Sequence, residues 1–390
     1  MRYIKRTLSS IIQNNINNKS NIIISGISGS GKSSAALSVY EKRSVISLDN
    51  IKNLILACNG NEFFKKYGKN IIIDNIEQCF SLLENINEDD NLVLLSDNNI
   101  DYINESKKEY IKYKLHGLSI YELANMGYMQ KPYKPCEKQP CIISHKSLSF
   151  TYQLIGRGFL MEAALLEDDK LWNEVINKKV EKIVDKSIIG SINNDNKISF
   201  LNFLKELAKY TAKELNLTEI AEKLQLAPNT IKSWVKLLES INFIYLVKSY
   251  SIDNKRRYIK TPKVYMEDTG IAAWLLDIEN PKDLENHNLR QNLFENFVIS
   301  EIIKSYHHNG KECKIYHYRD NVGVKIDLLI EDDDYIYPVY ISDSKTPEYN
   351  ISNINKAALH KPLGYGNHIC LVDKSVKISD NFSAISIWEI

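Results

Sequence analysis

The sequence of 390 residues is poor in cysteine, contains no long apolar run and carries almost no net charge. Six scattered cysteines in a chain of this length favour reduced thiols over a disulfide framework. No window approaches the roughly 18 apolar residues of a membrane span. The first 20 residues contain charges but no apolar stretch, so we expect no signal peptide. These absences predict a soluble, cytoplasmic protein.

Charge gives no indication of a general partner. Fifty basic and 49 acidic residues leave a formal charge of +1, so no overall attraction to nucleic acid or to an anionic membrane follows. The composition is that of a globular protein, with 44% hydrophobic and 25% charged residues. Because a chain of 390 residues is longer than one ordinary hydrophobic core supports, we expect two or three domains.

Short apolar runs alternate with helix-like runs between residues 21 and 95. This βαβ rhythm predicts a parallel sheet covered by helices, which is an α/β fold. A loop rich in proline and lysine at residues 130–147 indicates a domain boundary. Helical periodicity then dominates over residues 160–240, and mixed helix and strand patterns return over residues 312–390.

The most specific motif is GISGSGKS, Gly26 to Ser33, which matches the P-loop signature in full. It follows an apolar strand and opens a helix, where its glycines let backbone N–H groups converge on phosphate oxygens. Lys32 is expected to span the β- and γ-phosphates, and the Ser33 hydroxyl to ligate Mg²⁺. The predicted nucleotide-binding residues are Gly26, Ile27, Ser28, Gly29, Ser30, Gly31, Lys32, Ser33 and Ser34.

An acidic residue at the end of another strand completes such a site. Asp74 closes the run IIID, a suitable position from which to hold Mg²⁺ through water, although an Asp at a strand end also caps helices. Ser96 or Asp97, at the end of LVLLS, is a candidate sensor of the γ-phosphate. No Asn-Lys-x-Asp guanine signature is present, which favours ATP over GTP.

The residue that activates the attacking water is the open question at this site. P-loop ATPases usually place Glu after this Asp, but the chain has Asn75 there and an acid at Glu77. An amide cannot accept the proton of the water, and an extended chain carries Glu77 about 7 Å past Asn75. We therefore expect slow turnover, in which Asn75 orients the water and Glu77 matters less. Brisk hydrolysis by a displaced acid at Glu77 is the alternative.

Arginine is scarce, with eight residues in the whole chain. If an arginine stabilises the charge of the transition state, Arg157 in IGRGF is the candidate, with Arg2 and Arg6 as alternatives. For each of the three, a role as ordinary surface charge fits the sequence equally well.

In their order along the chain, these motifs resemble a prokaryotic family of AAA-like P-loop ATPases that carry a winged-helix segment and a C-terminal domain related to restriction endonucleases. The resemblance rests on GISGSGKSS, VISLD, IIID, GLSIYEL, RGF, LNLTEIAEKLQLAPNTIKSWVKLLE, KVYMEDTGIAAWLL, NLFENFVISEI and YHYRDNVGVKIDLLI. It implies ATP binding and four parts: a P-loop domain at 1–147, a helical lid or linker at 148–195, a winged helix at 196–268 and a restriction-endonuclease-like domain at 269–390.

The C-terminal domain departs from the nuclease pattern that the resemblance implies. That pattern has an acid on a helix, an Asp closing a strand and Glu-x-Lys on the next strand, which hold Mg²⁺ and position water. Glu295 and Asp327 fit the first two positions, but Tyr340 and Ser342 stand at the Glu and Lys positions. Lys325 also stands where the family carries Glu. We therefore expect no nuclease activity and a fold retained as a scaffold.

In the winged-helix segment, Pro228 is expected to begin a helix whose outward face carries basic residues. Residues 196–262 contain 12 Lys and Arg against 6 Asp and Glu. The predicted DNA contacts are Lys232, Lys236, Arg256 and Arg257. Since winged helices also serve as protein-docking modules, contact with DNA and docking to protein both stay open.

Cys136, Cys141 and His145, with His116 upstream, have a zinc-like spacing. The two cysteines lie in a proline-rich loop without flanking structural signals, which favours a coincidental loop over a zinc site. The cofactors that the sequence predicts are therefore ATP and Mg²⁺.

Two functions fit these residues. The first is a slow, Mg²⁺-dependent ATPase that acts as a nucleotide switch and moves the winged-helix and C-terminal domains. The second is an ATP-loaded adaptor or DNA-binding module that is deficient in hydrolysis. Both require binding of Mg·ATP, both are compatible with a protein partner or a homo-oligomer, and neither involves a membrane.

Overall fold

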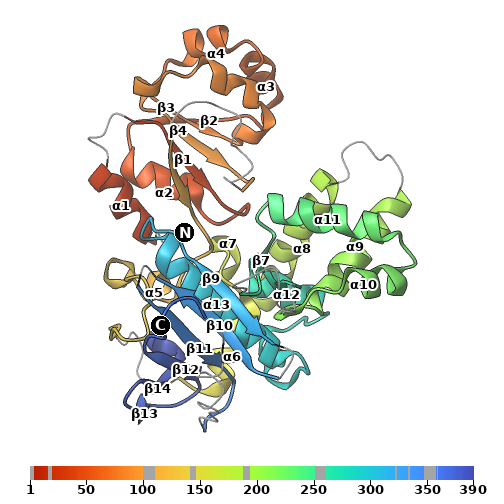
Figure 1. Ribbon diagram of the computed structural model, residues 1–390. Coiled ribbons are helices and arrows are strands. Elements are labelled where there is room, and N and C mark those ends of the chain that lie inside the picture. Colours follow the sequence, from red (N-terminus) through yellow and green to blue (C-terminus); the bar gives the residue numbers. More distant parts are fainter. Residues whose placement is uncertain are drawn as a thin grey trace.

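The computed structural model describes residues 4–15, 20–99, 110–140, 146–187, 194–250, 261–320, 323–332, 334–346, 357 and 359–390. These residues form a five-stranded sheet, a six-stranded sheet, a small three-stranded sheet and the helices that connect them (Figure 1). The α/β fold class predicted from the sequence is confirmed. Among the helices described, none combines the length and the apolar character needed to cross a membrane.

The five-stranded sheet is parallel and contains the N-terminal part of the chain. In spatial order it runs β2-β3-β4-β1-β5. The strands are β1 (Ile22–Ser25), β2 (Ser44–Ser47), β3 (Ile71–Asp74), β4 (Val93–Ser96) and β5 (Ile111–Lys114). Ser25 aligns with Ser96, and Ser47 aligns with Asp74. Because parallel strands end at the same edge, the polar residues that close them gather there, where ligands of such sheets bind.

Helices cover both faces of this sheet. They are α1 (Thr7–Asn15), α2 (Lys32–Val39), α3 (Ile51–Ala57) and α4 (Gly60–Tyr67). Ile24 of β1 packs in a cluster with Leu8 of α1 and Ala35 of α2. Ile23, which points to the opposite face, packs in a second cluster with Phe63 of α4. A strand buried on both faces is apolar throughout, which explains the uninterrupted isoleucine runs of β1 and β3.

The middle of the chain is mainly helical. Its helices are α5 (Ile120–Leu123), α6 (Leu148–Arg157), α7 (Met161–Ala164), α8 (Asp169–Ser187), α9 (Asn194–Ala208), α10 (Leu217–Leu224), α11 (Pro228–Ser240) and α12 (Thr269–Leu275). A small antiparallel sheet contains β6 (Lys213–Glu214), β8 (Lys263–Met266) and β7 (Ile244–Val247), in that spatial order. The prediction that Pro228 begins a helix is confirmed. Proline suits this position because the backbone N–H groups of the first helical turn have no partner within the helix, so the missing N–H costs nothing.

The six-stranded sheet is mixed and contains the C-terminal part of the chain, in the spatial order β13-β14-β12-β11-β10-β9. Its strands are β9 (Ile315–Arg319), β10 (Lys325–Glu331), β11 (Ile336–Ile341), β12 (Gly366–Cys370), β13 (Val376–Ser379) and β14 (Phe382–Ser386). Helix α13 (Arg290–His307) precedes this sheet and is buried continuously from Leu293 to Ser305. A helix buried around its whole circumference has to be enclosed by the rest of the fold.

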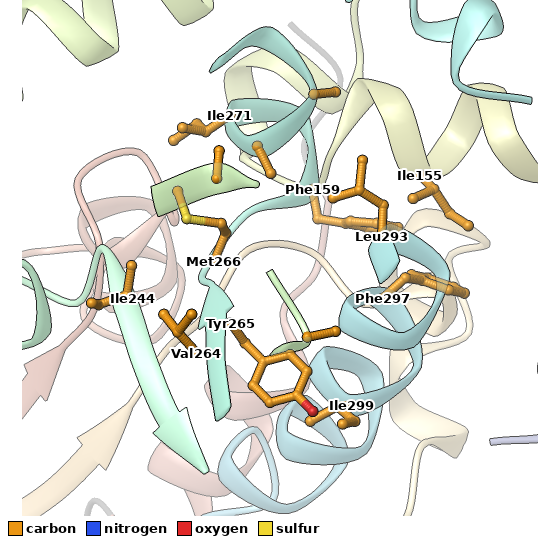
Figure 2. Packing of buried hydrophobic residues seen from close by; sticks show 14 of the residues in the cluster. Ile155, Phe159, Ile244, Val264, Tyr265, Met266, Ile271, Leu293, Phe297 and Ile299 are labelled. Carbon is orange, nitrogen blue, oxygen red and sulfur yellow. The ribbon is translucent and has the colours of Figure 1, made fainter. Parts of the chain in front are cut away.

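One hydrophobic cluster joins the helical middle, the small sheet and the C-terminal sheet. Figure 2 shows Phe159, Val264 and Phe297 among its members. Phe159 stacks on Phe297 of α13, with 5.4 Å between the ring centroids. Tyr121 and Tyr133, which follow β5, also belong to this cluster. The domain boundaries proposed from the sequence stay predictions, since the parts that follow the P-loop sheet share this core.

Candidate nucleotide-binding site

The P-loop connects β1 to α2 at the polar edge of the parallel sheet. Gly29 and Gly31 have φ angles of +87° and +93°, in the left-handed region that favours glycine. At Gly26, a Cβ atom would collide with the carbonyl oxygen of Leu115. These three positions therefore need glycine, and the loop forms a backbone cradle that larger residues would fill. Such a cradle suits an anion such as a nucleotide phosphate.

Lys32 begins α2 and is buried, with 6% of its surface exposed. Its Nζ donates hydrogen bonds to the carbonyl oxygens of Gly26 at 2.8 Å and Ile27 at 3.2 Å. The same ammonium group forms an ion pair with Asp97 Oδ1 at 2.8 Å. Lys32 is thus held between the P-loop carbonyls and the residue that follows β4.

The two predicted Mg²⁺ ligands are in direct contact, because the Ser33 hydroxyl donates to Asp74 Oδ2 at 3.0 Å. Asp74 Oδ1 accepts a hydrogen bond from the Asn75 N–H at 3.0 Å. Burial raises the pKa of Asp74, and the Ser33 hydrogen bond and the Lys32 charge oppose that shift. A hydroxyl and a carboxylate are oxygen ligands of the kind Mg²⁺ prefers, so the residues present fit the cation.

The chain bends sharply after Asp74, which corrects the expectation of an extended chain. Asn75 has a φ of +60° and a ψ of +45°, and a 3₁₀ turn follows at Ile76–Gln78. Asn is one of the few residues other than Gly that visits this left-handed region readily. Glu77 therefore returns toward β4, where its Oε2 accepts a hydrogen bond from the Asp97 N–H at 3.2 Å. Asn75 Nδ2 donates to Glu77 Oε1 at 3.4 Å.

Ser96 ends β4 and is fully buried. Its hydroxyl accepts a hydrogen bond from the Asn98 N–H at 3.0 Å. Its carbonyl oxygen accepts one from the N–H of Gly26 at 3.1 Å. Ser96 thus supports the first residue of the P-loop through its backbone.

The residues after Ser96 contact the end of helix α11. Asn242 Nδ2 donates to the Asp97 carbonyl oxygen at 2.8 Å, and the Asn99 N–H donates to the Ser240 carbonyl oxygen at 2.7 Å. Because the Asp97 carboxylate holds Lys32, a single residue touches both the P-loop lysine and the residues at the end of α11.

Arg157, the first arginine candidate, is buried at the end of α6. Its guanidinium pairs with Asp169 and donates to the carbonyl oxygen of Leu166. These partners fix the turn between α6 and α8, so the guanidinium is engaged within the helical segment. Arg2 lies outside the described residues.

Arg6 is fully buried and approaches the P-loop from the α1 side. It pairs with Glu122 at 3.0 Å and donates to the carbonyl oxygen of Ser30 and to that of His116, the latter at 2.9 Å. A guanidinium with an anionic partner and loop carbonyl acceptors stabilises the loop itself. Among the described arginine candidates, both guanidinium groups therefore have structural partners.

A cavity of about 250 Å³ lies beside the P-loop. Its wall includes Ser28, Glu77, Asp97, Lys179, Lys182 and Leu237. Residues of the P-loop, of the segments that follow β3 and β4, and of α8 and α11 thus meet around one space. Pockets that bury a whole ligand typically enclose roughly 300–1,000 Å³, so the cavity in this arrangement is smaller than a complete nucleotide site.

Helices α7 and α8 lie against the P-loop, which the sequence did not indicate. The Met161 N–H donates to the Gly29 carbonyl oxygen at 3.2 Å, and the Met161 thioether lies against Gly31. Lys179 Nζ occupies the space that a Cβ atom of Gly29 would need. Lys179 also pairs with Glu162 at 3.1 Å. A lone lysine in a helix carries no motif, so only the fold reveals its place at the loop.

The acids of the nuclease-like pattern meet a lysine from the small sheet. Glu295 on α13 is buried, and its Oε1 accepts from Lys263 Nζ at 2.7 Å and from the Tyr265 hydroxyl at 2.8 Å. Burial raises the pKa of Glu295, the Lys263 charge lowers it, and the nearby Asp327 raises it. Asp327 Oδ2 accepts from the Ile341 N–H at 3.1 Å. An internal ammonium group thus neutralises the helical acid.

Tyr340 and Ser342 lie on and just after β11, and neither supplies a carboxylate or an ammonium group. The Ser342 hydroxyl shares a hydrogen bond with His368 Nε2 at 2.8 Å. The Tyr340 hydroxyl is buried without a hydrogen-bond partner in the part of the chain that the structure describes. Burial and the Asp327 charge raise the pKa of Tyr340 to about 12.

Lys232 and Lys236 are exposed on α11, as the sequence predicts. The buried residues on the opposite side of that helix are Ile231, Val235 and Leu238. Arg256 and Arg257, the other two predicted DNA contacts, lie outside the described residues.

His116 belongs to a partly buried junction. Its Nδ1 and Nε2 contact Glu267 Oε1 and His307 Nδ1, each at 2.6 Å. Cys141 and His145 lie outside the described residues. Within the described ranges, no group of three or more His, Cys, Asp or Glu side chains is placed to hold a metal ion.

Two family models match parts of the chain, and both describe domains of unknown function. DUF8612 matches residues 151–282, and DUF4143 matches residues 290–390. The second match supports a protein of the P-loop ATPase-like kind, because DUF4143 is found in proteins associated with AAA ATPases.

Uncharacterized proteins of Mycobacterium bovis and of Mycobacterium tuberculosis are each 25% identical to this chain over 153 residues. The matched segment is 39% of this chain and 33% of each relative, so the chain spans about a third of the length of these relatives.

A solved structure from Pyrococcus horikoshii, a signal transduction ATPase with numerous domains and a tetratricopeptide repeat sensor, is also similar. It is 14% identical, and the match covers 75% of this chain and 44% of that one, with a TM-score of 0.25. A likeness this slight supports no argument about this chain.

Proposed function

We propose that this protein binds Mg·ATP at its P-loop and hydrolyses it slowly, as a nucleotide switch. The observation that carries the proposal is the contact of Ser33 with Asp74 at 3.0 Å beside the glycine cradle and the buried Lys32. The loop offers a phosphate its backbone cradle and the positive charge of Lys32, and Ser33 with the strand end at Asp74 offers oxygen ligands to a hard cation.

The proposed roles follow from these positions. Lys32 would leave Asp97 and its loop carbonyls to contact the β- and γ-phosphates. Ser33 and Asp74 would hold Mg²⁺, directly and through water respectively, and the cation would supply charge neutralisation at the phosphates. The backbone N–H groups of the loop, with the first turn of α2, would receive the remaining phosphate oxygens.

Glu77 is our proposed general base, in place of an acid directly after Asp74. The left-handed bend at Asn75 supports this assignment, because it directs the Glu77 carboxylate to the cavity beside the P-loop. Asn75 Nδ2 and the Asp97 N–H both donate to that carboxylate. Both donors compete with the attacking water for the lone pairs of that carboxylate, which is the physical reason for slow turnover.

Asp97 supports the proposal of a switch. Its carboxylate pairs with Lys32, and its carbonyl oxygen accepts from Asn242, just beyond α11. A phosphate that attracts Lys32 would draw this lysine away from the Asp97 carboxylate and so alter the contacts of a residue that holds the end of α11. The expected readout is movement of α11 and of the parts that share its core.

A second candidate function, an ATP-loaded adaptor or DNA-binding module without useful hydrolysis, is favoured by Asn75 at the usual place of the catalytic acid. In that case Lys232 and Lys236 on the exposed side of α11 are the proposed contacts, with Arg256 and Arg257 as further candidates. Nuclease activity is not part of either proposal, because the helical acid Glu295 is neutralised by Lys263.

Two measurements on the full chain separate these candidates: the affinity for Mg·ATP and the steady-state rate of phosphate release, each with and without duplex DNA. Tight binding with slow, measurable release supports the switch. Tight binding without release, in the presence or absence of DNA, supports the adaptor. The absence of binding excludes both.

A further inference from the structure

Helix α8 places the ammonium group of Lys179 beside Gly29 of the P-loop, a position that no sequence motif predicts. Lys179 Nζ lies where a Cβ atom of Gly29 would be, so the glycine leaves the space that the ammonium group fills. Lys179 and Glu77 line the same cavity. The ammonium group therefore lies beside the phosphate loop and on the same side as the candidate base.

Glu162 on α7 neutralises this lysine. The ion pair joins Lys179 Nζ to Glu162 Oε2 at 3.1 Å. The Lys179 side chain is 14% exposed, whereas the Glu162 side chain is 53% exposed. A carboxylate that is half in water is a weakly held partner, because solvent competes for it and screens the attraction. A doubly charged phosphate group inside the cavity would be a stronger acceptor.

Helix α7 is itself bound to the P-loop. Met161, which precedes Glu162, donates its N–H to the Gly29 carbonyl oxygen at 3.2 Å and lays its thioether against Gly31. The P-loop in this arrangement is therefore covered by α7, and the ion pair between Glu162 and Lys179 fastens α7 to α8. Release of Lys179 would loosen that cover.

Two other cations near the loop, Arg6 and Arg157, pair with buried or partly buried acids. Lys182 lines the same cavity and pairs with Asp49 at 3.6 Å, but its side chain is half exposed, so Lys179 is the more buried of the two lysines there. A nucleoside triphosphate has a terminal phosphate that a diphosphate lacks, and that group needs a cation beyond Lys32 and the metal.

We infer that Lys179 exchanges Glu162 for the terminal phosphate of a bound nucleoside triphosphate, so that Glu162 acts as a built-in competitor of that phosphate. This inference rests on the proposed binding of ATP at the P-loop. It makes Lys179 the residue that distinguishes ATP from ADP. It also makes α7 and α8 the segment that responds to the terminal phosphate. A ligand shifts a two-state element only by its differential affinity for the two states, and here the terminal phosphate supplies the difference.

The test is calorimetric titration of the full chain with Mg²⁺ and either ADP or a non-hydrolysable ATP analogue. The variants are Lys179→Gln and Glu162→Gln. The matched control is Lys178→Gln, which removes an exposed charge from the neighbouring position of the same helix. In Lys179→Gln, affinity for the analogue should fall about tenfold while affinity for ADP changes less than about twofold. In Glu162→Gln, affinity for the analogue should rise about threefold or more.

A loss of equal size for both nucleotides in Lys179→Gln would overturn the inference, as would an unchanged analogue affinity in Glu162→Gln. If the unmodified protein binds neither nucleotide, the proposed function fails and the inference fails with it. If it binds both and the two variants behave like Lys178→Gln, only the role of Lys179 and Glu162 is excluded.

Discussion

Lys32 and Asp97 form a buried ion pair, with 2.8 Å between Nζ and Oδ1, that joins the P-loop to the residue following β4. The two side chains are 6% and 14% exposed. The Asp97 carbonyl oxygen also accepts from Asn242 beyond α11. Lys32, which is expected to contact a nucleotide phosphate, is thus paired with Asp97, a residue that also contacts the end of helix α11.

Replacement of Lys32 by Ala should abolish or severely weaken nucleotide binding. A charge-assisted hydrogen bond contributes about 1.5–3 kcal/mol, so we expect affinity for Mg·ATP to fall by about 10- to 100-fold or more. Calorimetry provides the measurement. The exposed Lys42 offers a control, because Lys42→Ala removes the same charge away from the loop. Equal affinity in Lys32→Ala and the unmodified protein would remove the basis of the proposed site.

The ion pair of Lys263 and Glu295 should be important for stability. Both side chains are less than one tenth exposed, and removal of one partner from a buried pair typically costs about 3–5 kcal/mol. Since Glu295 has a raised pKa and can take up a proton, we expect Lys263→Met to lower the free energy of unfolding by about 3 kcal/mol. The double variant Lys263→Met, Glu295→Gln should regain part of the lost free energy of unfolding. Urea denaturation is the measurement.

A control is available on β10 of the C-terminal sheet. Lys325 is 60% exposed and lies 3.6 Å from Asp327, so Lys325→Met should change the free energy of unfolding by less than about 1 kcal/mol. If Lys263→Met is no more destabilising than Lys325→Met, the C-terminal acids are not held by an internal ammonium group.

The protein should leave plasmid DNA intact in the presence of Mg²⁺ or Mn²⁺. Metal-assisted cleavage needs converging carboxylates, whereas Glu295 is paired with Lys263 and Tyr340 replaces a further acid. Gel analysis over several hours is the measurement. Cleavage that disappears in Asp327→Ala would mean that the acids have been assigned to the wrong positions.

Any binding of duplex DNA should be mainly electrostatic. Joint replacement of Lys232 and Lys236 by Ala should weaken it and lower the slope of log affinity against log salt by about 0.9 for each phosphate that the protein no longer neutralises. A second variant replaces all four predicted DNA contacts by Ala: Lys232, Lys236, Arg256 and Arg257. Fluorescence anisotropy over a series of salt concentrations is the measurement, with the exposed pair Lys65 and Lys66 on α4 as control. Binding that is insensitive to salt and to these changes would exclude α11 as the DNA-binding helix.

The sequence predicted the parts of this molecule that depend on local pattern. The isoleucine runs of β1 and β3 are strands because both faces of the parallel sheet are buried, and the P-loop glycines are needed for the left-handed φ angles of Gly29 and Gly31. The contact between Ser33 and Asp74 also follows from strand order, because parallel strands end at a common edge.

The remaining features depend on tertiary contacts that a linear pattern does not contain. The left-handed bend at Asn75 returns Glu77 to the site, and the propensity of Asn for that conformation is too weak a signal to predict it. Lys179 is one of many helical lysines until α8 packs on the P-loop. Lys263, likewise, is an ordinary strand lysine until β8 meets α13.

The central claim is that the protein binds Mg·ATP and hydrolyses it slowly through Glu77. The most direct measurement is the rate of phosphate release at saturating Mg·ATP, recorded beside ATP affinity, for the unmodified protein and for Glu77→Gln and Asn75→Glu. We expect an unmodified rate below about 1 s⁻¹, lowered about 100-fold in Glu77→Gln without loss of affinity. Asn75→Glu should give no gain, because Glu at a φ of +60° is strained. A tenfold gain in Asn75→Glu, with Glu77→Gln unchanged, would contradict this account.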